Sequence, residues 1–170
     1  SFGVQSADDR QLGFLGRLHD FSSASKAVMD AEKAGFDNIS CDFMLGLAGQ
    51  SMESLNETID RITALPIKHI SAYMLKIEQG TAFDNNTIRK AVADDDKVSD
   101  MYLNTVQRLE KLGFEQYEIS NFAKDKCYSR HNLKYWNCDE YLGFGPAAYS
   151  EFGGDRFGNS RDLAVYIEGG

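Results

Sequence analysis

The strongest constraint on this chain is a unit that occurs twice: an amphipathic helix, then Gly-Phe, then a strand. Small and apolar residues recur at helical spacing over residues 24–34, and Gly35 and Phe36 precede the strand-like run NISCDFML. A second helical pattern covers residues 98–112, and Gly113-Phe114 precede the strand-like run QYEISNFA. A glycine at this place ends a helix by adopting a positive φ. Strand–helix alternation over about 120 residues predicts an α/β fold with a mainly parallel sheet and right-handed crossovers.

The remaining elements fit the same alternation. A helix with Ser51 as its N-cap is expected after NISCDFML and is ended by Pro66. HISAYML follows as a strand, the polar stretch Gly80–Ala93 is expected to be a loop, and the acidic run Asp94–Asp96 suits the start of the next helix. Beyond QYEISNFA we expect a loop that holds the segment RHNLKYW, and then a glycine-punctuated strand in YLGFGPAAYS. The last third is therefore rich in loops and aromatic residues.

Each predicted strand has one apolar face and one face with polar groups. In NISCDFML, Cys41 and Phe43 alternate with Ser40, Asp42 and Met44. A parallel sheet buried on both sides is usually apolar on both faces. Polar groups near the carboxyl ends of strands are what a barrel presents to a ligand in its interior. The pattern fits either a barrel or an open doubly wound sheet. An interior whose polar side chains bind a ligand is one of two interpretations of these strand faces.

Composition excludes several function classes. The 170 residues carry a net charge of −8, which argues against binding to a nucleic-acid backbone. We expect no membrane span, because no run of about 18 apolar residues occurs. The three cysteines are an odd number without a CxxC pair, so we expect a reducing, cytoplasmic setting and neither a disulfide framework nor a structural zinc site.

Two residues and one glycine-rich run in or after the first two strands are candidate ligand contacts, each with a plainer alternative. Asp42 could accept hydrogen bonds from ribose hydroxyls, or it could serve a turn or a helix cap. Arg17, in the connection that Gln5 begins, could hold a carboxylate through two hydrogen bonds, or lie exposed at a helix end. The glycine-rich run Gly46–Ser51 could cradle an anion at a helix N-terminus, or make a tight strand-to-helix turn.

The segment RHNLKYW gives a second group of candidates. His131, with Tyr135 and the chain's only tryptophan, Trp136, could contact a flat aromatic ligand or ligate haem iron. A histidine on a loop can also be a simple hydrogen-bonding residue, and the aromatic residues can be core. Cys127 and Cys138 flank the segment, but their ten-residue separation is a weak metal signal.

Taken in order, GVQS, LGR, NISCDFMLGLAGQ, HISAYMLKIEQGT, LGFEQYEISNFA, HNLKYW and YLGFGPAAYS resemble the oxygen-independent coproporphyrinogen III oxidase-like proteins. These are radical S-adenosylmethionine (SAM) proteins. The resemblance covers nearly the whole chain, and the HNxxYW version is closer to the branch described as haem chaperones. It implies the second half of a partial (β/α) TIM-like barrel over residues 1–93. A helix–strand extension with HNxxYW, residues 94–170, would pack on the same domain.

The resemblance also implies site residues and cofactors. Gln5, Arg17 and Asp42 would contact SAM, and the region of His131, Asn132, Tyr135 and Trp136 would lie near porphyrin or haem. The whole protein would use SAM and a [4Fe-4S] cluster. The family's CxxxCxxC cluster motif is absent here, Ala48 stands where relatives often have proline, and Tyr149 stands where many carry histidine.

Two functions follow from the resemblance. In an oxidase, a radical derived from SAM would start the oxidative decarboxylation of porphyrin propionates to vinyl groups. In the alternative, the protein would bind haem and deliver it to an apoprotein. We expect this chain to be a fragment that lacks the cluster-binding part and is inactive alone, and to self-associate through the exposed edge of its half-barrel. The electron donor is not identified by the sequence.

Overall fold

Strands with alternating apolar residues form the central sheet in the computed structural model, which describes residues 1–169. Strands β1 (Phe2–Gln5), β2 (Ser40–Leu45) and β3 (His69–Met74) pair in parallel. Strands β5 (Asn121–Ala123) and β4 (Glu115–Gln116) extend the sheet in antiparallel pairing, which gives the order β1-β2-β3-β5-β4. The predicted α/β fold is confirmed, and its parallel part is the first three strands.

The run QYEISNFA is not one strand, as its apolar pattern predicted, but a hairpin of β4 and β5. The Glu118 carboxylate accepts hydrogen bonds from the Ser120 amide and the Asn121 side chain, and the Tyr117 amide donates to the Asn121 carbonyl. These local hydrogen bonds reverse the direction of the chain. The Glu118 carboxylate accepts hydrogen bonds from N–H groups that, in a straight strand, would bond to a neighbouring strand.

Five helices belong to the same part of the chain, each begun by a side chain that accepts a backbone hydrogen bond. The predicted N-cap Ser51 is observed and forms a reciprocal capping pair with Ser54, and Asp94, in the acidic run predicted to start a helix, caps the helix that follows it. A short helix lies inside the stretch Gly80–Ala93 predicted as loop, because Asn85 caps it. The helices are α1 (Asp9–Phe14), α2 (Phe21–Lys33), α3 (Met52–Thr63), α4 (Asn86–Ala91) and α5 (Asp95–Lys111).

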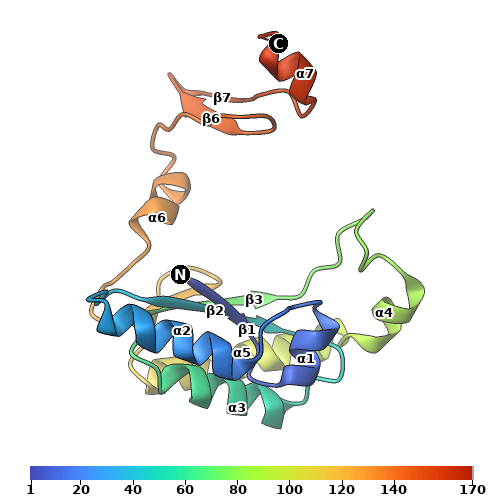
Figure 1. The fold of residues 1–170 in the computed structure, drawn as a ribbon, viewed down its shortest axis with the longest axis vertical. Coiled ribbons are helices and arrows are strands. Elements are labelled where there is room, and N and C mark those ends of the chain that lie inside the picture. The colour runs from blue at the N-terminus through green and yellow to red at the C-terminus, as the bar shows by residue number, and fades with distance from the viewer. Residues whose placement is uncertain (170) are drawn as a thin grey trace. The chain divides into compact units, whose positions relative to one another are not determined.

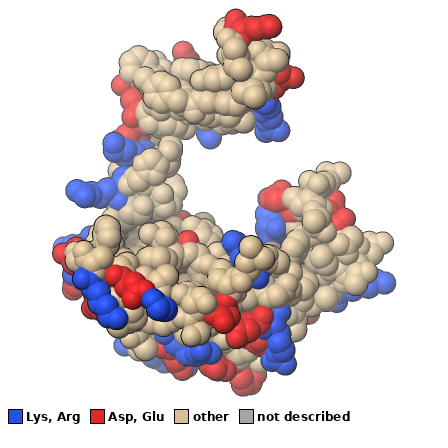
Figure 2. All heavy atoms as spheres, in the orientation of Figure 1, with Lys and Arg blue, Asp and Glu red and all other residues tan. Residues whose placement is uncertain are grey.

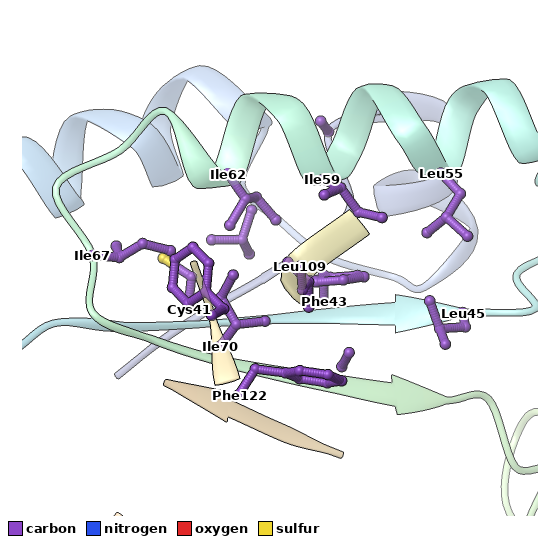
Figure 3. Packing of buried hydrophobic residues seen from close by; sticks show 14 of the residues in the cluster. Cys41, Phe43, Leu45, Leu55, Ile59, Ile62, Ile67, Ile70, Leu109 and Phe122 are labelled. Carbon is purple, nitrogen blue, oxygen red and sulfur yellow. The ribbon is translucent and has the colours of Figure 1, made fainter. Parts of the chain in front are cut away.

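The core lies between the helices and one face of the sheet. Helices α2, α3 and α5 all cover this face, as Figure 1 shows. Leu55, Ile59 and Ile62 point from α3 onto Cys41 and Phe43 of β2, and all five side chains are fully buried (Figure 3). Each such side chain contributes about 1.5–3 kcal/mol when buried. The apolar strand face was therefore predicted correctly, and the polar face is left on the other side of the sheet.

The structure divides into two compact units, residues 1–128 and 129–170. The sequence analysis placed the boundary at residue 93, but α5 lies in the first unit, where it packs on α3 and β2. The predicted extent of the barrel half stays a prediction. The second unit contains α6 (Arg130–Trp136), β6 (Tyr149–Phe152), β7 (Asp155–Gly158) and α7 (Leu163–Ile167).

Two expectations about the second unit are wrong. RHNLKYW is helix α6 rather than a loop, because the Ser129 hydroxyl caps its first turn. YLGFGPAAYS is mostly irregular and enters a strand only at Tyr149. Its glycines serve a close approach: a Cβ at Gly143 would stand 2.1 Å from the Tyr149 carbonyl oxygen.

Candidate functional site

A row of polar positions crosses the face of the sheet opposite the core. Gly3 pairs with Asp42, Asp42 with Ser71, and Ser71 with Asn121, so these residues lie side by side on four neighbouring strands. The Ser71 hydroxyl donates to the Asn121 side-chain oxygen at 2.8 Å, and the Asn121 amide donates to Glu118. In the first unit the helices cover the opposite face (Figure 1). Ser71 and Asn121 are buried and bonded to each other, so Asp42, half-buried beside the exposed Gly3, is the part of this row that can meet a polar ligand.

Gln5 lies at one end of this row in an unusual conformation. Its φ is +68°, and the pairing of β1 with β2 is irregular between Gly3 and Gln5. A left-handed conformation at a non-glycine residue costs about 1–3 kcal/mol and is characteristic of functional sites. The Gln5 side-chain amide nitrogen lies 2.8 Å from where a Cβ of residue 3 would stand, so it folds over Gly3. Gly3 pairs with Asp42, so Gln5 and Asp42 meet at the same part of the sheet.

Asp42 is half-buried, and its charge is only partly compensated. Burial raises the pKa of this carboxyl above its ordinary value, while the hydrogen bond from the Ser1 hydroxyl, the nearby Ser71 hydroxyl and the positive charge of the Ser1 amino group act in the opposite direction. No ion pair within 4.0 Å involves Asp42 among residues 1–169. A partly desolvated carboxylate without an ion-pair partner is a strong acceptor for a ligand's hydroxyl groups.

Sequence reasoning missed a second polar row beside the first. His69 is buried; its Nδ1 lies 2.9 Å from the Ser40 hydroxyl and its Nε2 lies 2.7 Å from the Tyr117 hydroxyl. The Tyr117 ring stacks on Tyr128 at a centroid distance of 4.5 Å. Burial lowers the pKa of His69, although Glu118 acts in the opposite direction. The signal was available in the sequence, because His69 and Ser71 are two residues apart and so lie on one face of the same strand.

The glycine-rich turn after β2 is filled by its own chain. The Gln50 side-chain oxygen accepts hydrogen bonds from the amides of Gly46 and Leu47 at 2.8 and 3.2 Å, and its nitrogen donates to the Met44 carbonyl. Gln50 is 1% exposed. These amides already have an acceptor, so the structure favours the tight turn over the anion cradle. The turn fixes the carboxyl end of β2, three residues beyond Asp42.

Arg17 is not brought into contact with Gln5 or Asp42. It lies exposed after α1, and its backbone amide donates to the Leu12 carbonyl. Within residues 1–169 no hydrogen bond or ion pair holds its side chain. His19, two residues later, lies with Nε2 3.4 Å from the Val4 carbonyl, so the loop returns to β1 beside Gln5. The SAM contact of Arg17 stays a prediction.

The second candidate group lies together on α6. His131 and Tyr135 are one helical turn apart, and the His131 Nε2 lies 3.0 Å from the Tyr135 hydroxyl. Both are exposed, as is Trp136, while Asn132 is half-buried in the first turn. The Tyr135 ring meets Tyr141 edge-on at 4.6 Å. An exposed imidazole beside aromatic rings can ligate iron and contact a flat ring system.

The cysteines do not form a metal site. Cys41 is fully buried, and burial raises its pKa to about 12, which disfavours the thiolate that a metal requires. Cys127 and Cys138 lie in different units. In the described part of the chain, no three His, Cys, Asp or Glu side chains are grouped to hold a metal ion. No helix there is long and apolar enough to span a bilayer.

Comparison with known proteins found no matching family model. Among curated proteins, the chain is 38% identical over 170 residues to the heme chaperone HemW of Bacillus subtilis, covering 99% of this chain and 45% of that protein. It is 36% identical over 154 residues to the mouse mitochondrial radical S-adenosyl methionine domain-containing protein 1, covering 89% and 35%. The chain thus spans less than half the length of these relatives.

A solved structure has the same fold. The coproporphyrinogen III oxidase HemN of Escherichia coli, described as a radical SAM enzyme, matches with a TM-score of 0.75 over 95% of this chain and 40% of that one, at 19% identity. At this identity the match concerns the fold alone. The curated relatives confirm the resemblance: the chain belongs to the radical SAM family that includes the HemW heme chaperones.

Proposed function

We propose that this chain is part of a haem-handling radical SAM protein, and that haem is carried cargo bound through helix α6. The observation that carries the proposal is the exposed pair of His131 and Tyr135, with Nε2 and the hydroxyl 3.0 Å apart. Curated relatives at 34–38% identity are named heme chaperones, which supports this alternative over the oxidase that the sequence analysis placed first.

His131 would supply the axial ligand. Neutral imidazole nitrogen is a common ligand of haem iron. Coordination through Nε2 would replace its hydrogen bond with Tyr135, which could then turn its ring toward the macrocycle. Tyr135 and Trp136, each 43% exposed, would cover part of the apolar ring, and such burial contributes about 25 cal/mol per Å².

SAM would be held by the polar face of the first unit. Asp42 fits the ribose diol, because it is a half-buried acceptor without an ion-pair partner, and the Gln5 amide lies at the same part of the sheet. Arg17 would pair the carboxylate of SAM from its loop. When bound beside a reduced [4Fe-4S] cluster, SAM supplies a carbon-centred radical. This chain's own residues would orient the nucleoside and keep water from it.

The oxidase remains the second candidate, because the motifs of this chain resemble oxygen-independent coproporphyrinogen III oxidase-like proteins. One experiment separates the two. The cluster-reconstituted whole protein is incubated without oxygen with SAM, a reductant and coproporphyrinogen III, and separately titrated with haem. We expect a Soret shift on haem addition and no conversion of the porphyrinogen. Conversion to protoporphyrinogen would overturn the chaperone function in favour of the oxidase.

A further inference from the structure

The second unit contains a small pocket next to the helix that carries His131. Residues on three adjacent backbone segments form its floor: Tyr141 exchanges two backbone hydrogen bonds with Glu151, at 2.8 and 2.9 Å, and Glu151 pairs with Arg156 across the β6–β7 hairpin. The pocket has a volume of about 270 Å³ and is lined by Tyr135, Cys138, Tyr141, Glu151 and Arg156.

One wall of this pocket is aromatic and leads to His131. The rings of Tyr135 and Tyr141 meet at 81° with centroids 4.6 Å apart, and the His131 ring meets Tyr135 at 86° and 5.0 Å. Each pair has the edge-to-face geometry that aromatic rings favour. The proposed iron ligand and the pocket therefore share Tyr135 as a common wall.

The lining of the pocket also includes a cation in a defined place. The Arg156 guanidinium carbon lies 5.3 Å from the centroid of the Tyr149 ring. Tyr149 lies flat over Gly158, since a Cβ at residue 158 would stand 2.9 Å from the ring. Among residues 1–169, no carboxylate forms an ion pair with Arg156, although Glu151 is its direct partner across the hairpin. The guanidinium is thus positioned by an aromatic ring and keeps its hydrogen-bond donors for a ligand.

Charged side chains elsewhere do not offer the same setting. On the face shown in Figure 2, Lys and Arg are interspersed with Asp and Glu, and no broad basic surface is visible. Arg156 is the cation among the residues that line the pocket. An arginine of this kind recognises a carboxylate through two parallel hydrogen bonds.

We propose that this pocket binds the propionate edge of the haem whose iron His131 holds, with Arg156 pairing a propionate carboxylate. The inference rests on the proposed function and names the part of the cargo that the second unit recognises. The pocket is too small for a whole macrocycle, so it accommodates one carboxylate-bearing edge between Tyr141 and Arg156. Glu151 beside it repels the same carboxylate, which weakens binding and suits a protein that must release its cargo.

The test compares two ligands and four proteins. The 170-residue chain and its Arg156→Gln, Glu151→Gln and Arg161→Gln variants are titrated with iron(III) protoporphyrin and with its dimethyl ester, following the Soret band. Arg161 is an exposed arginine of the same unit outside the pocket and is the matched control. We expect Arg156→Gln to weaken binding of the free acid about five- to tenfold and to leave binding of the ester unchanged. Glu151→Gln should strengthen binding of the free acid several-fold.

The outcomes separate this inference from the function on which it rests. If the unsubstituted chain binds neither ligand, the haem-handling function fails. If it binds both equally, and Arg156→Gln behaves like Arg161→Gln, haem binding stands and the propionate contact is overturned. Opposite effects of the Arg156 and Glu151 substitutions, confined to the free acid, support the contact, because loss of folding would weaken both ligands alike.

Discussion

The side-chain amide of Gln5 lies over Gly3, with its nitrogen 2.8 Å from where a Cβ at residue 3 would stand. The strained backbone is that of Gln5, whose φ is positive. Its side chain lies over Gly3, which pairs with Asp42 on the neighbouring strand. A larger residue at position 3 would move a flexible side chain rather than the backbone. Gly3 is therefore a residue whose substitution should disturb ligand binding more than folding.

We predict that Gly3→Ala weakens SAM binding about fivefold, because the displaced Gln5 amide loses a hydrogen bond to the nucleoside. The free energy of unfolding should change by less than about 1 kcal/mol. Equilibrium dialysis with labelled SAM and urea denaturation measure the two effects. Gly13→Ala is the control, because a Cβ there meets nothing within 4 Å. Equal SAM binding by both variants would refute the role of Gln5.

Asp42→Asn should have opposite effects on stability and binding. Burial raises the pKa of Asp42, so ionisation of this group at neutral pH costs stability, and that cost disappears as pH falls through the raised pKa. The neutral amide should therefore raise the free energy of unfolding at pH 7 and weaken SAM binding at least tenfold. Thermal unfolding at pH 7 and at pH 3.5 checks the sign: a stabilisation that does not shrink at low pH would contradict this account.

His69 should make the fold sensitive to mild acid. Its folded-state pKa is lowered by burial, so the unfolded chain binds the proton more readily below the ordinary value of 6.5. The free energy of unfolding should be level above about pH 7 and fall as the pH drops from 6.5 toward 5. Urea denaturation across this range measures the slope, which should be reduced in His69→Gln. An unchanged slope in that variant would assign the effect to another group.

Gln50→Ala should destabilise the first unit by about 2–3 kcal/mol, because the buried amides of Gly46 and Leu47 lose their acceptor. Gln107→Ala, at an exposed position of α5, is the matched control and should stay within about 0.5 kcal/mol. The midpoint of urea unfolding reports both. If Gln50→Ala lowers the free energy of unfolding no more than Gln107→Ala does, water replaces the lost side chain as the hydrogen-bond acceptor.

Sequence periodicity was enough to place the main strands and helices of the first unit. The alternation of Cys41 and Phe43 with Asp42 correctly assigned the two faces of β2, and Gly35 and Gly113 both adopt the positive φ expected after a helix. The hairpin of β4 and β5 was missed because it depends on the Glu118 carboxylate, a contact between side chain and backbone that leaves no periodic signal.

The candidate site was predictable only in part. Gln5 and Asp42 could be assigned to the polar face from alternation, but their meeting depends on the irregular pairing of β1 with β2 and on Gly3. The role of Gln50 within the turn could not be read from composition, because a glycine-rich run fits an anion cradle and a filled turn equally well. Helix α6 was missed because seven residues are too few for a clear helical period.

Haem binding through His131 is the central claim, and one titration tests it most directly. The 170-residue chain is titrated with haem alongside His131→Ala and His19→Ala, the latter removing a histidine of the first unit. The account predicts that His131→Ala loses the Soret shift or weakens haem binding more than tenfold, whereas His19→Ala binds as the unsubstituted chain does. A Soret shift of the same position and midpoint in His131→Ala would contradict the account.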